Sequence, residues 1–177
     1  MKNNNNLDVR YYENSLFFAQ MTEHVFISEL LQEAYYRYGK IIEILRPEID
    51  TSGYDIVLEC NDFTRHIQLK TSKSTSRTSS QTINSGLSEK PSGCVIWIFR
   101  EGPHQEDNNQ RMQLSYLYFG GKPGEVLPSL EHFRIGKHTK ANSKGLKGER
   151  QSTRVIPKGE FEKIPDTKEL LKVLFNL

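Results

Sequence analysis

The chain has 177 residues, of which 36% are hydrophobic and 26% are charged. A chain of this length is expected to form one domain with a substantial core. Its 24 basic and 22 acidic residues leave a net charge of only +2, which excludes a protein that binds a polyanion through bulk charge alone.

The cysteine count and the hydropathy pattern limit the compartment. Only two cysteines occur, Cys60 and Cys94, and both lie within apolar runs, so a reducing compartment fits better than a disulfide framework. No stretch approaches the ~20 apolar residues of a membrane span, and the asparagine-rich start lacks the regions of a signal peptide. We therefore expect a soluble cytoplasmic protein.

The first part of the chain predicts a helix followed by three strands. Apolar residues recur at three- and four-residue spacing over residues 22–38, as on one face of an amphipathic helix, and Gly39 is suited to end it. Three short runs rich in β-branched and apolar residues follow, at residues 41–45, 54–60 and 64–70, and turn residues bound each of them.

The middle of the chain predicts a crossover and two more strands. Residues 71–92 are rich in serine, threonine and lysine, with Ile83 and Leu87 at helical spacing, and we interpret them as a loop followed by a short crossover helix. Residues 94–99 form an unbroken apolar run, which is typical of a strand buried on both faces. Residues 112–119 alternate as a further strand.

The C-terminal third is locally basic. Residues 134–163 contain nine lysines and arginines against three glutamates, so a polyanion could bind there despite the small net charge. Residues 136–152 have little periodicity and predict a long basic loop. At the end of the chain, Asp166 and Glu169 precede an apolar pattern at helical spacing, which predicts a capped amphipathic helix.

Three polar residues in the central strands point to metal-dependent chemistry. Asp55 begins the run at residues 54–60, and Gln68 and Lys70 lie two residues apart on the next strand, so both face the same side. A carboxylate and a carboxamide oxygen suit Mg²⁺, which takes few protein ligands and keeps several waters. A lysine beside such an ion can position or deprotonate the attacking water and offset charge in the transition state.

Each of these residues also has an ordinary structural interpretation. Asp55 follows Gly53 and can be a turn residue at the start of a strand. Gln68 can be an edge polar residue, and Lys70 a charge at a strand end. Asp50 is a rival carboxylate, but it lies in the loop before the strand rather than at its head.

The order helix, three strands, crossover and buried strand resembles the core of the PD-(D/E)xK nuclease superfamily, also called the restriction-endonuclease-like fold. In that superfamily an aspartate heads the second core strand, as Asp55 does here, and an acid-x-lysine motif lies on the third. Gln68 stands where the acid is usual and Lys70 matches the lysine, a Gln-x-Lys variant that resembles Mrr-type restriction enzymes and uncharacterised bacterial members. The resemblance covers residues 22–119.

The resemblance implies an α/β fold with an αβββαβ core, in which a mixed central sheet is flanked by helices. Residues 1–177 would then form a single nuclease-like domain. Its core would span about residues 22–119, and residues 120–177 would add the basic loop and the C-terminal helix.

The resemblance also implies a Mg²⁺- or Mn²⁺-dependent endonuclease that hydrolyses DNA. Asp55, Gln68 and the main-chain carbonyl of Leu69 would bind the metal, and Lys70 would act at the attacking water. A neutral ligand such as Gln68 binds metal less tightly than a carboxylate, so the chain can instead be a nuclease-fold protein that binds nucleic acid without cutting it. A third hypothesis is a metal-free protein whose basic C-terminal third meets an acidic protein partner.

Many members of the superfamily carry a further catalytic glutamate on the first helix, followed by apolar residues three, four and seven positions later. Glu23 fits that pattern, with Phe26, Ile27 and Leu30 at those positions, whereas Glu29 lies off the apolar face. A glutamate in a first helical turn also complements the helix dipole without any catalytic role.

Two basic segments are the candidates for DNA binding. Near the motif, basic residues lie among hydroxyl-bearing ones, and further basic residues follow in the C-terminal third, where glycines allow close approach to a phosphate backbone. Either segment can equally be solvated loop. The candidate nucleic-acid-binding residues are Lys73, Arg77, Lys137, His138, Lys140, Lys144, Lys147, Arg150 and Arg154. The resemblance adds a homodimer as an expectation, because two copies cut two strands.

Overall fold

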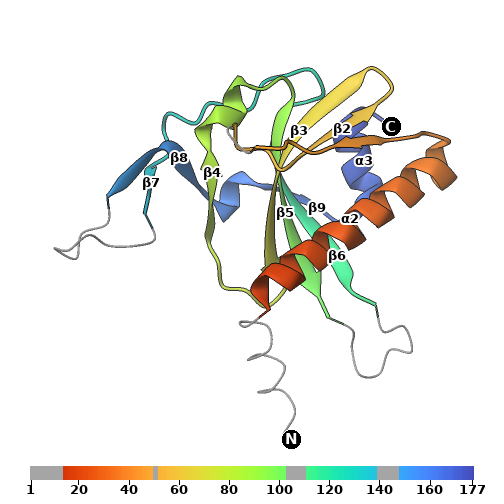
Figure 1. Ribbon diagram of the computed structural model, residues 1–177, viewed down its shortest axis with the longest axis horizontal. Coiled ribbons are helices and arrows are strands. Elements are labelled where there is room, and N and C mark those ends of the chain that lie inside the picture. The colour runs from red at the N-terminus through yellow and green to blue at the C-terminus, as the bar shows by residue number, and fades with distance from the viewer. Residues whose placement is uncertain (1–13, 50–51, 103–110, 139–147) are drawn as a thin grey trace, which may run out of the picture.

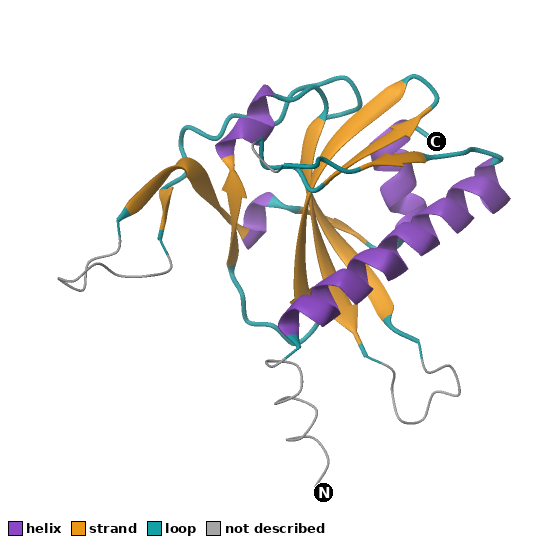
Figure 2. Ribbon diagram, in the orientation of Figure 1, coloured by secondary structure: helices purple, strands orange, loops and turns teal. Residues whose placement is uncertain are grey.

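The computed structural model describes residues 14–49, 52–102, 111–138 and 148–177. Helices α2 (Ser15–Tyr38) and α3 (Thr167–Phe175) pack on one face of a six-stranded sheet, and a three-stranded sheet covers its other face (Figures 1 and 2). The described part of the chain contains no helix both long and apolar enough to cross a membrane.

The central sheet is mixed, as expected for an α/β fold. Its strands lie in the order β1, β2, β3, β5, β6 and β9, and only the β3–β5 pair is parallel. The strands are β1 (Glu43–Leu45), β2 (Ile56–Cys60), β3 (Phe63–Lys73), β5 (Gly93–Glu101), β6 (Gln113–Gly120) and β9 (Glu162–Ile164). A helix, a three-stranded antiparallel unit and a strand parallel to the third therefore follow the predicted order.

Helix α2 ends and helix α3 begins where the sequence predicts. Gly39 adopts a left-handed conformation (φ 63°) after α2, and its N–H donates to the carbonyl of Tyr35 at 2.9 Å. At the start of α3, the Asp166 carboxylate accepts a hydrogen bond from the N–H of Glu169 at 2.9 Å. Helix α2 begins at Ser15, ahead of the predicted start at residue 22.

The central strand β5 is buried on both faces, as predicted. Cys94, Ile96 and Ile98 join the core under the helices, whereas Val95 and Trp97 join the core between the two sheets. Both cysteines of the chain are buried and free, and both belong to the core under the helices. Burial raises the pKa of the Cys94 thiol, which therefore stays protonated.

The predicted crossover helix was wrong. Residues of this segment form strand β4 (Ser80–Asn84) and a short 3₁₀ helix, η1 (Ser85–Glu89). Ile83 and Leu87 are fully buried in the core between the sheets, but on a strand and a 3₁₀ turn. The segment has few strong helix formers, and β8 supplies backbone partners for β4, so strand pairing prevails. In the described part of the chain, the two α-helices cover one face of the central sheet, and β4 and η1 lie on the other.

The predicted basic loop was also wrong at both of its ends. Strand β7 (Ile135–Lys137) pairs antiparallel with β8 (Glu149–Pro157), which in turn pairs with β4. A Cβ at Gly136 would lie 2.3 Å from Oγ1 of Thr153, so this close pairing requires glycine. The first four residues of β8 are all exposed, so the sequence shows no alternation of polar and apolar residues there. Lys140, Lys144 and Lys147 lie outside the described residues.

A buried arginine lies in the core between β3 and β6. The side chain of Arg65 is fully buried, its Nη2 donates to the Tyr118 hydroxyl and to the carbonyl of Gly121, and its guanidinium lies 5.8 Å from the Tyr118 ring. Among the described atoms, Nε and Nη1 of Arg65 have no hydrogen-bond partner. Burial raises the pKa of Tyr118 far above its ordinary value, so this partner of Arg65 is neutral.

We expect Arg65→Met to cost much less stability than Arg65→Ala. Methionine fills most of the same space and removes a charge that is costly to bury, whereas alanine leaves a cavity worth about 3 kcal/mol. The Tyr118 hydroxyl keeps its hydrogen bond to the Gly121 carbonyl (2.8 Å) in both variants. Urea unfolding followed by the fluorescence of Trp97 measures the difference. Equal losses in the two variants would contradict this and show that the guanidinium itself stabilises the core.

Candidate functional site

The carboxylate of Asp55 lies against the Gln-x-Lys segment. Asp55 comes directly before β2, and its N–H donates to the carbonyl of Ile67 at 2.8 Å, which continues the β2–β3 pairing by one residue. Its Oδ2 accepts a hydrogen bond from the N–H of Leu69 at 2.6 Å. The side chain thus takes the place of a backbone acceptor, and the carboxylate is held beside the middle residue of the segment.

The turn before Asp55 is fixed by a close approach to the second sheet. Gly53 has a left-handed conformation (φ 77°), and a Cβ there would lie 2.1 Å from Cβ of Asn84. Any other residue type at this position would be strained at the positive φ, and its Cβ would clash with Asn84. Gly53 therefore determines how the chain enters β2 and where the Asp55 carboxylate lies.

Gln68 is buried beneath the junction of β4 and η1. Gln68 is 6% exposed, and its Oε1 accepts a hydrogen bond from the N–H of Asn84 at 3.2 Å. The Asn84 side chain in turn accepts from the N–H of Gly86 at 3.0 Å and caps η1. The buried carboxamide therefore has a defined partner from the second sheet.

Gln68 and Lys70 share one face of β3, as the spacing predicts. Leu69, between them, packs against the core under the helices, so its two neighbours point toward the second sheet. Lys70 is half-buried and lies opposite Trp97 in the parallel β3–β5 register. The indole Nε1 of Trp97 donates to Oγ of Ser72 at 2.9 Å, which fixes this end of the strand.

Glu23 lies on the helix that packs on the other face of the sheet. Its carboxylate forms an ion pair with Arg46, which follows β1. The structure therefore brings Asp55, Gln68 and Lys70 to one side of β3, and it gives Glu23 a partner of its own. The rival carboxylate Asp50 lies outside the described residues.

Glu29 has a structural environment. Its Oε2 accepts hydrogen bonds from the Tyr116 hydroxyl at 3.2 Å and from the Thr167 hydroxyl at 3.1 Å. These contacts join α2, β6 and the start of α3. Burial raises the pKa of Tyr116 well above its ordinary range, so the phenol remains a donor to Glu29.

The donor atoms at the site suit a hard divalent cation. Within the described ranges no group of three or more histidine, cysteine, aspartate or glutamate side chains gathers as a metal site, so zinc-type ligation is not found there. Asp55 offers a carboxylate, and Gln68 and the main chain of Leu69 offer carbonyl oxygens, which are the ligands that Mg²⁺ takes beside water. A carbonyl oxygen has two lone pairs, so Gln68 Oε1 can accept from Asn84 and still bind a metal.

The sequence did not identify two residues that lie next to the site. Tyr54 and His66 meet edge to face with ring centroids 5.0 Å apart, and Nδ1 of His66 lies 2.8 Å from the carbonyl oxygen of Pro91, to which it donates. His66 precedes Gln68 by two residues, so strand alternation alone indicates that it shares that face. Asn84 was also missed, and no sequence signal connects it with Gln68.

The candidate DNA-binding residues fall in two separate regions. On the β7–β8 hairpin, which lies away from α2 in Figure 1, Lys137, His138 and Arg150 are exposed. Arg154 on the same hairpin is half-buried, and its Nη1 donates to the carbonyl oxygens of Gln151 and Thr153. The other region holds Lys73, half-buried at the end of β3, and Arg77, exposed in the connection to β4.

Comparison with known proteins does not add a family. No protein-family model, curated protein or solved structure matches this chain. The resemblance to the PD-(D/E)xK superfamily therefore depends on Asp55, on the Gln-x-Lys segment and on the order of the elements around them.

We expect Gln68→Glu to strengthen Mn²⁺ binding roughly tenfold, because a carboxylate is a better ligand for a hard cation than a carboxamide. The same substitution should destabilise the metal-free protein, since it buries a charge. Calorimetric titration with Mn²⁺ and urea unfolding measure the two effects. Gln113→Glu, on an exposed position of β6, is the matched control and should change neither. Unaltered Mn²⁺ affinity in Gln68→Glu would remove this residue from the metal site.

Proposed function

We propose that this protein is a metal-dependent endonuclease that hydrolyses DNA phosphodiester bonds. The observation that supports the proposal most directly is the 2.6 Å hydrogen bond from the N–H of Leu69 to Oδ2 of Asp55. It joins a carboxylate at the head of one strand to the Gln-x-Lys segment of the next. The proposed metal site therefore needs residues from both strands.

The proposed chemistry assigns a separate task to each residue. Asp55 supplies a negative charge and a hard oxygen ligand, and Gln68 and the carbonyl of Leu69 supply neutral oxygens. When bound, Mg²⁺ or Mn²⁺ lowers the pKa of a coordinated water and offsets charge on the phosphoryl oxygens. The Lys70 ammonium orients the attacking water and stabilises the negative charge that develops as the P–O bond breaks.

Glu23 remains a prediction with a separate test. Its ion pair with Arg46 links α2 to the end of β1, next to the start of β2. In the proposal Glu23 orients a ligand or a second metal ion. A structural role for Glu23 predicts that Arg46→Ala has the same effect as Glu23→Ala.

The basic hairpin supplies the proposed contacts to substrate. Lys137, His138 and Arg150 are exposed, and the two cations Lys137 and Arg150 suit the phosphate backbone of a duplex. Such contacts position the polymer and carry no sequence information. They support DNA as the substrate class and leave its sequence preference to residues that reach base edges.

A second candidate function is DNA binding without cleavage. The observation that favours it is the Gln68 side chain, which is neutral and whose oxygen already accepts from Asn84. A carboxamide in that position contributes less metal affinity than a carboxylate. Both functions predict salt-sensitive DNA binding. Only the nuclease predicts that DNA is cut, so a cleavage assay distinguishes them.

We expect Asp55→Asn and Lys70→Met to lower the cleavage of supercoiled plasmid in Mg²⁺ or Mn²⁺ by at least about 100-fold. Asparagine can still accept the hydrogen bond from Leu69, so the fold should persist. Lys163→Met, at an exposed position on β9, is the matched control for Lys70→Met and should cut at the wild-type rate.

Three outcomes of the plasmid assay separate the candidate functions. Wild-type cleavage that survives unchanged in Asp55→Asn and Lys70→Met would contradict the site. Salt-sensitive DNA binding without cleavage would favour the second candidate. A wild-type protein that neither binds nor cuts DNA at low salt would exclude both and favour a protein partner for the basic third of the chain.

A further inference from the structure

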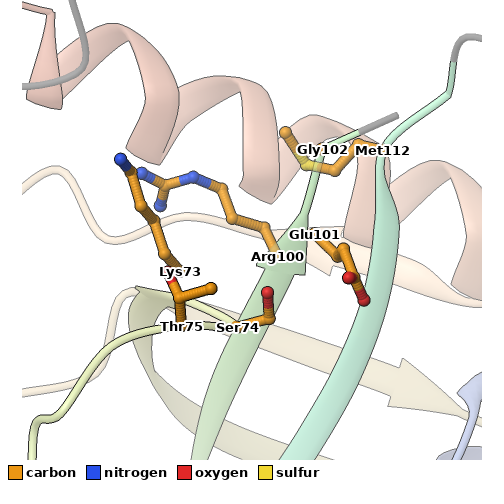
Figure 3. Close-up of a pocket in the computed structure, with 7 residues that line it drawn as sticks. All are labelled: Lys73, Ser74, Thr75, Arg100, Glu101, Gly102 and Met112. Atoms are coloured by element: carbon orange, nitrogen blue, oxygen red, sulfur yellow. The ribbon is translucent and has the colours of Figure 1, made fainter. Parts of the chain in front are cut away.

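A pocket of about 260 Å³ lies at the carboxyl ends of β3 and β5, the two parallel strands (Figure 3). Its lining comes from the last residues of both strands, the residue after β5, the start of the β3–β4 connection and the residue before β6. These residues are Lys73, Ser74, Thr75, Arg100, Glu101, Gly102 and Met112. The carboxyl ends of neighbouring parallel strands are where α/β folds most often bind ligands.

Two cationic side chains enter this pocket from neighbouring strands. Lys73 and Arg100 are direct partners in the parallel register, so their side chains leave the sheet on the same face. Figure 3 shows both reaching the same way, toward α2. The N–H of Ser74 donates to the carbonyl of Arg100 at 2.9 Å and holds the two strand ends together.

The guanidinium of Arg100 is held in a defined orientation. Its central carbon lies 5.4 Å from the centroid of the Phe18 ring on α2, which is within the range of a cation–π contact. An arginine fixed in this way presents a planar fork of N–H groups, which matches two oxygens of one phosphate. A lysine beside it adds a second point charge.

The remaining polar groups of the pocket fit the same ligand. Ser74 and Thr75 are exposed, and their hydroxyls can donate to phosphate oxygens. Among the described residues of the lining, Glu101 is the one carboxylate, and Figure 3 shows its carboxylate directed away from the Lys73 and Arg100 tips. Glu101 follows Arg100 on β5, so strand alternation turns the two side chains to opposite faces.

We propose that this pocket binds a phosphate group of the DNA backbone, with Lys73 and Arg100 as its principal contacts. The identity of the polymer rests on the function proposed above, whereas the phosphate chemistry rests on the pocket alone. The pocket lies three residues beyond Lys70 on β3, a separation of about 10 Å along the strand. Lys73 and Arg100 leave the sheet on the α2 face, whereas Lys70 points toward the second sheet, so DNA would have to pass round the carboxyl end of β3 to meet both. The pocket would then hold a phosphate away from the cleaved bond.

The test is duplex binding by the full chain in EDTA, where no cutting occurs, measured by fluorescence anisotropy over a range of salt concentrations. Lys73→Gln and Arg100→Gln should each weaken binding roughly five- to tenfold at about 0.1 M salt and lower the salt dependence by about one phosphate contact. Lys122→Gln removes one charge from an exposed loop position and is the matched control, with a change of less than about twofold.

Arg100 packs on Phe18, so circular dichroism must show that Arg100→Gln is folded. Arg100→Lys serves as the second variant, because it keeps the charge and loses the fork, and it should weaken binding nearly as much. Changes in Lys73→Gln and in both Arg100 variants that do not exceed that of Lys122→Gln would overturn the proposal. A wild-type protein that binds no duplex at low salt would overturn it as well.

Inorganic phosphate distinguishes a phosphate pocket from diffuse positive charge. At constant ionic strength, phosphate should compete with the duplex for the wild type and lose that effect in the Lys73→Gln/Arg100→Gln double variant. Equal competition in both would overturn a specific pocket. The plasmid assay is read separately, since duplex binding that depends on Lys73 and Arg100 without any cleavage would reject the nuclease and retain the pocket.

Discussion

The hydrogen bond from the N–H of Leu69 to Asp55 Oδ2 is the contact on which the candidate site depends. It ends the β2–β3 ladder with a side chain in place of a backbone carbonyl, so one carboxylate oxygen both completes the sheet and fixes the acid beside the Gln-x-Lys segment. Gly53 makes this arrangement available, since its left-handed turn lies where any side chain would meet Asn84. Local backbone geometry and the location of the chemistry are thus set together.

The second sheet determines what surrounds the motif. Strand β4 and the 3₁₀ helix η1 cover the face of β3 that carries Gln68, and the N–H of Asn84 supplies the partner of the buried carboxamide. In the interior of a helix at this crossover, the backbone N–H groups would bond to carbonyls of the same helix. A strand end leaves an N–H available for Gln68. The neutral residue in the motif and the strand in the crossover are therefore linked by one hydrogen bond.

Two groups of basic side chains are the candidates for contacts with a phosphate backbone. The β7–β8 hairpin presents exposed cations, while Lys73 and Arg100 converge on a pocket at the ends of the parallel strands. A net charge of +2 conceals this distribution, because acidic residues elsewhere balance the sum.

The sequence by itself determined the elements whose signals are local. Gly39 and Asp166 ended and began helices because caps depend on a few neighbouring backbone groups, and the apolar run of β5 was buried because no polar residue interrupts it. Alternation alone also predicted that Gln68 and Lys70 share a face. Only the tertiary structure decided that the crossover forms a strand, that the basic segment pairs with it, and that Asn84 and Arg100 join the candidate sites. Those outcomes depend on backbone hydrogen bonds and register between segments far apart in the chain, which no local pattern encodes.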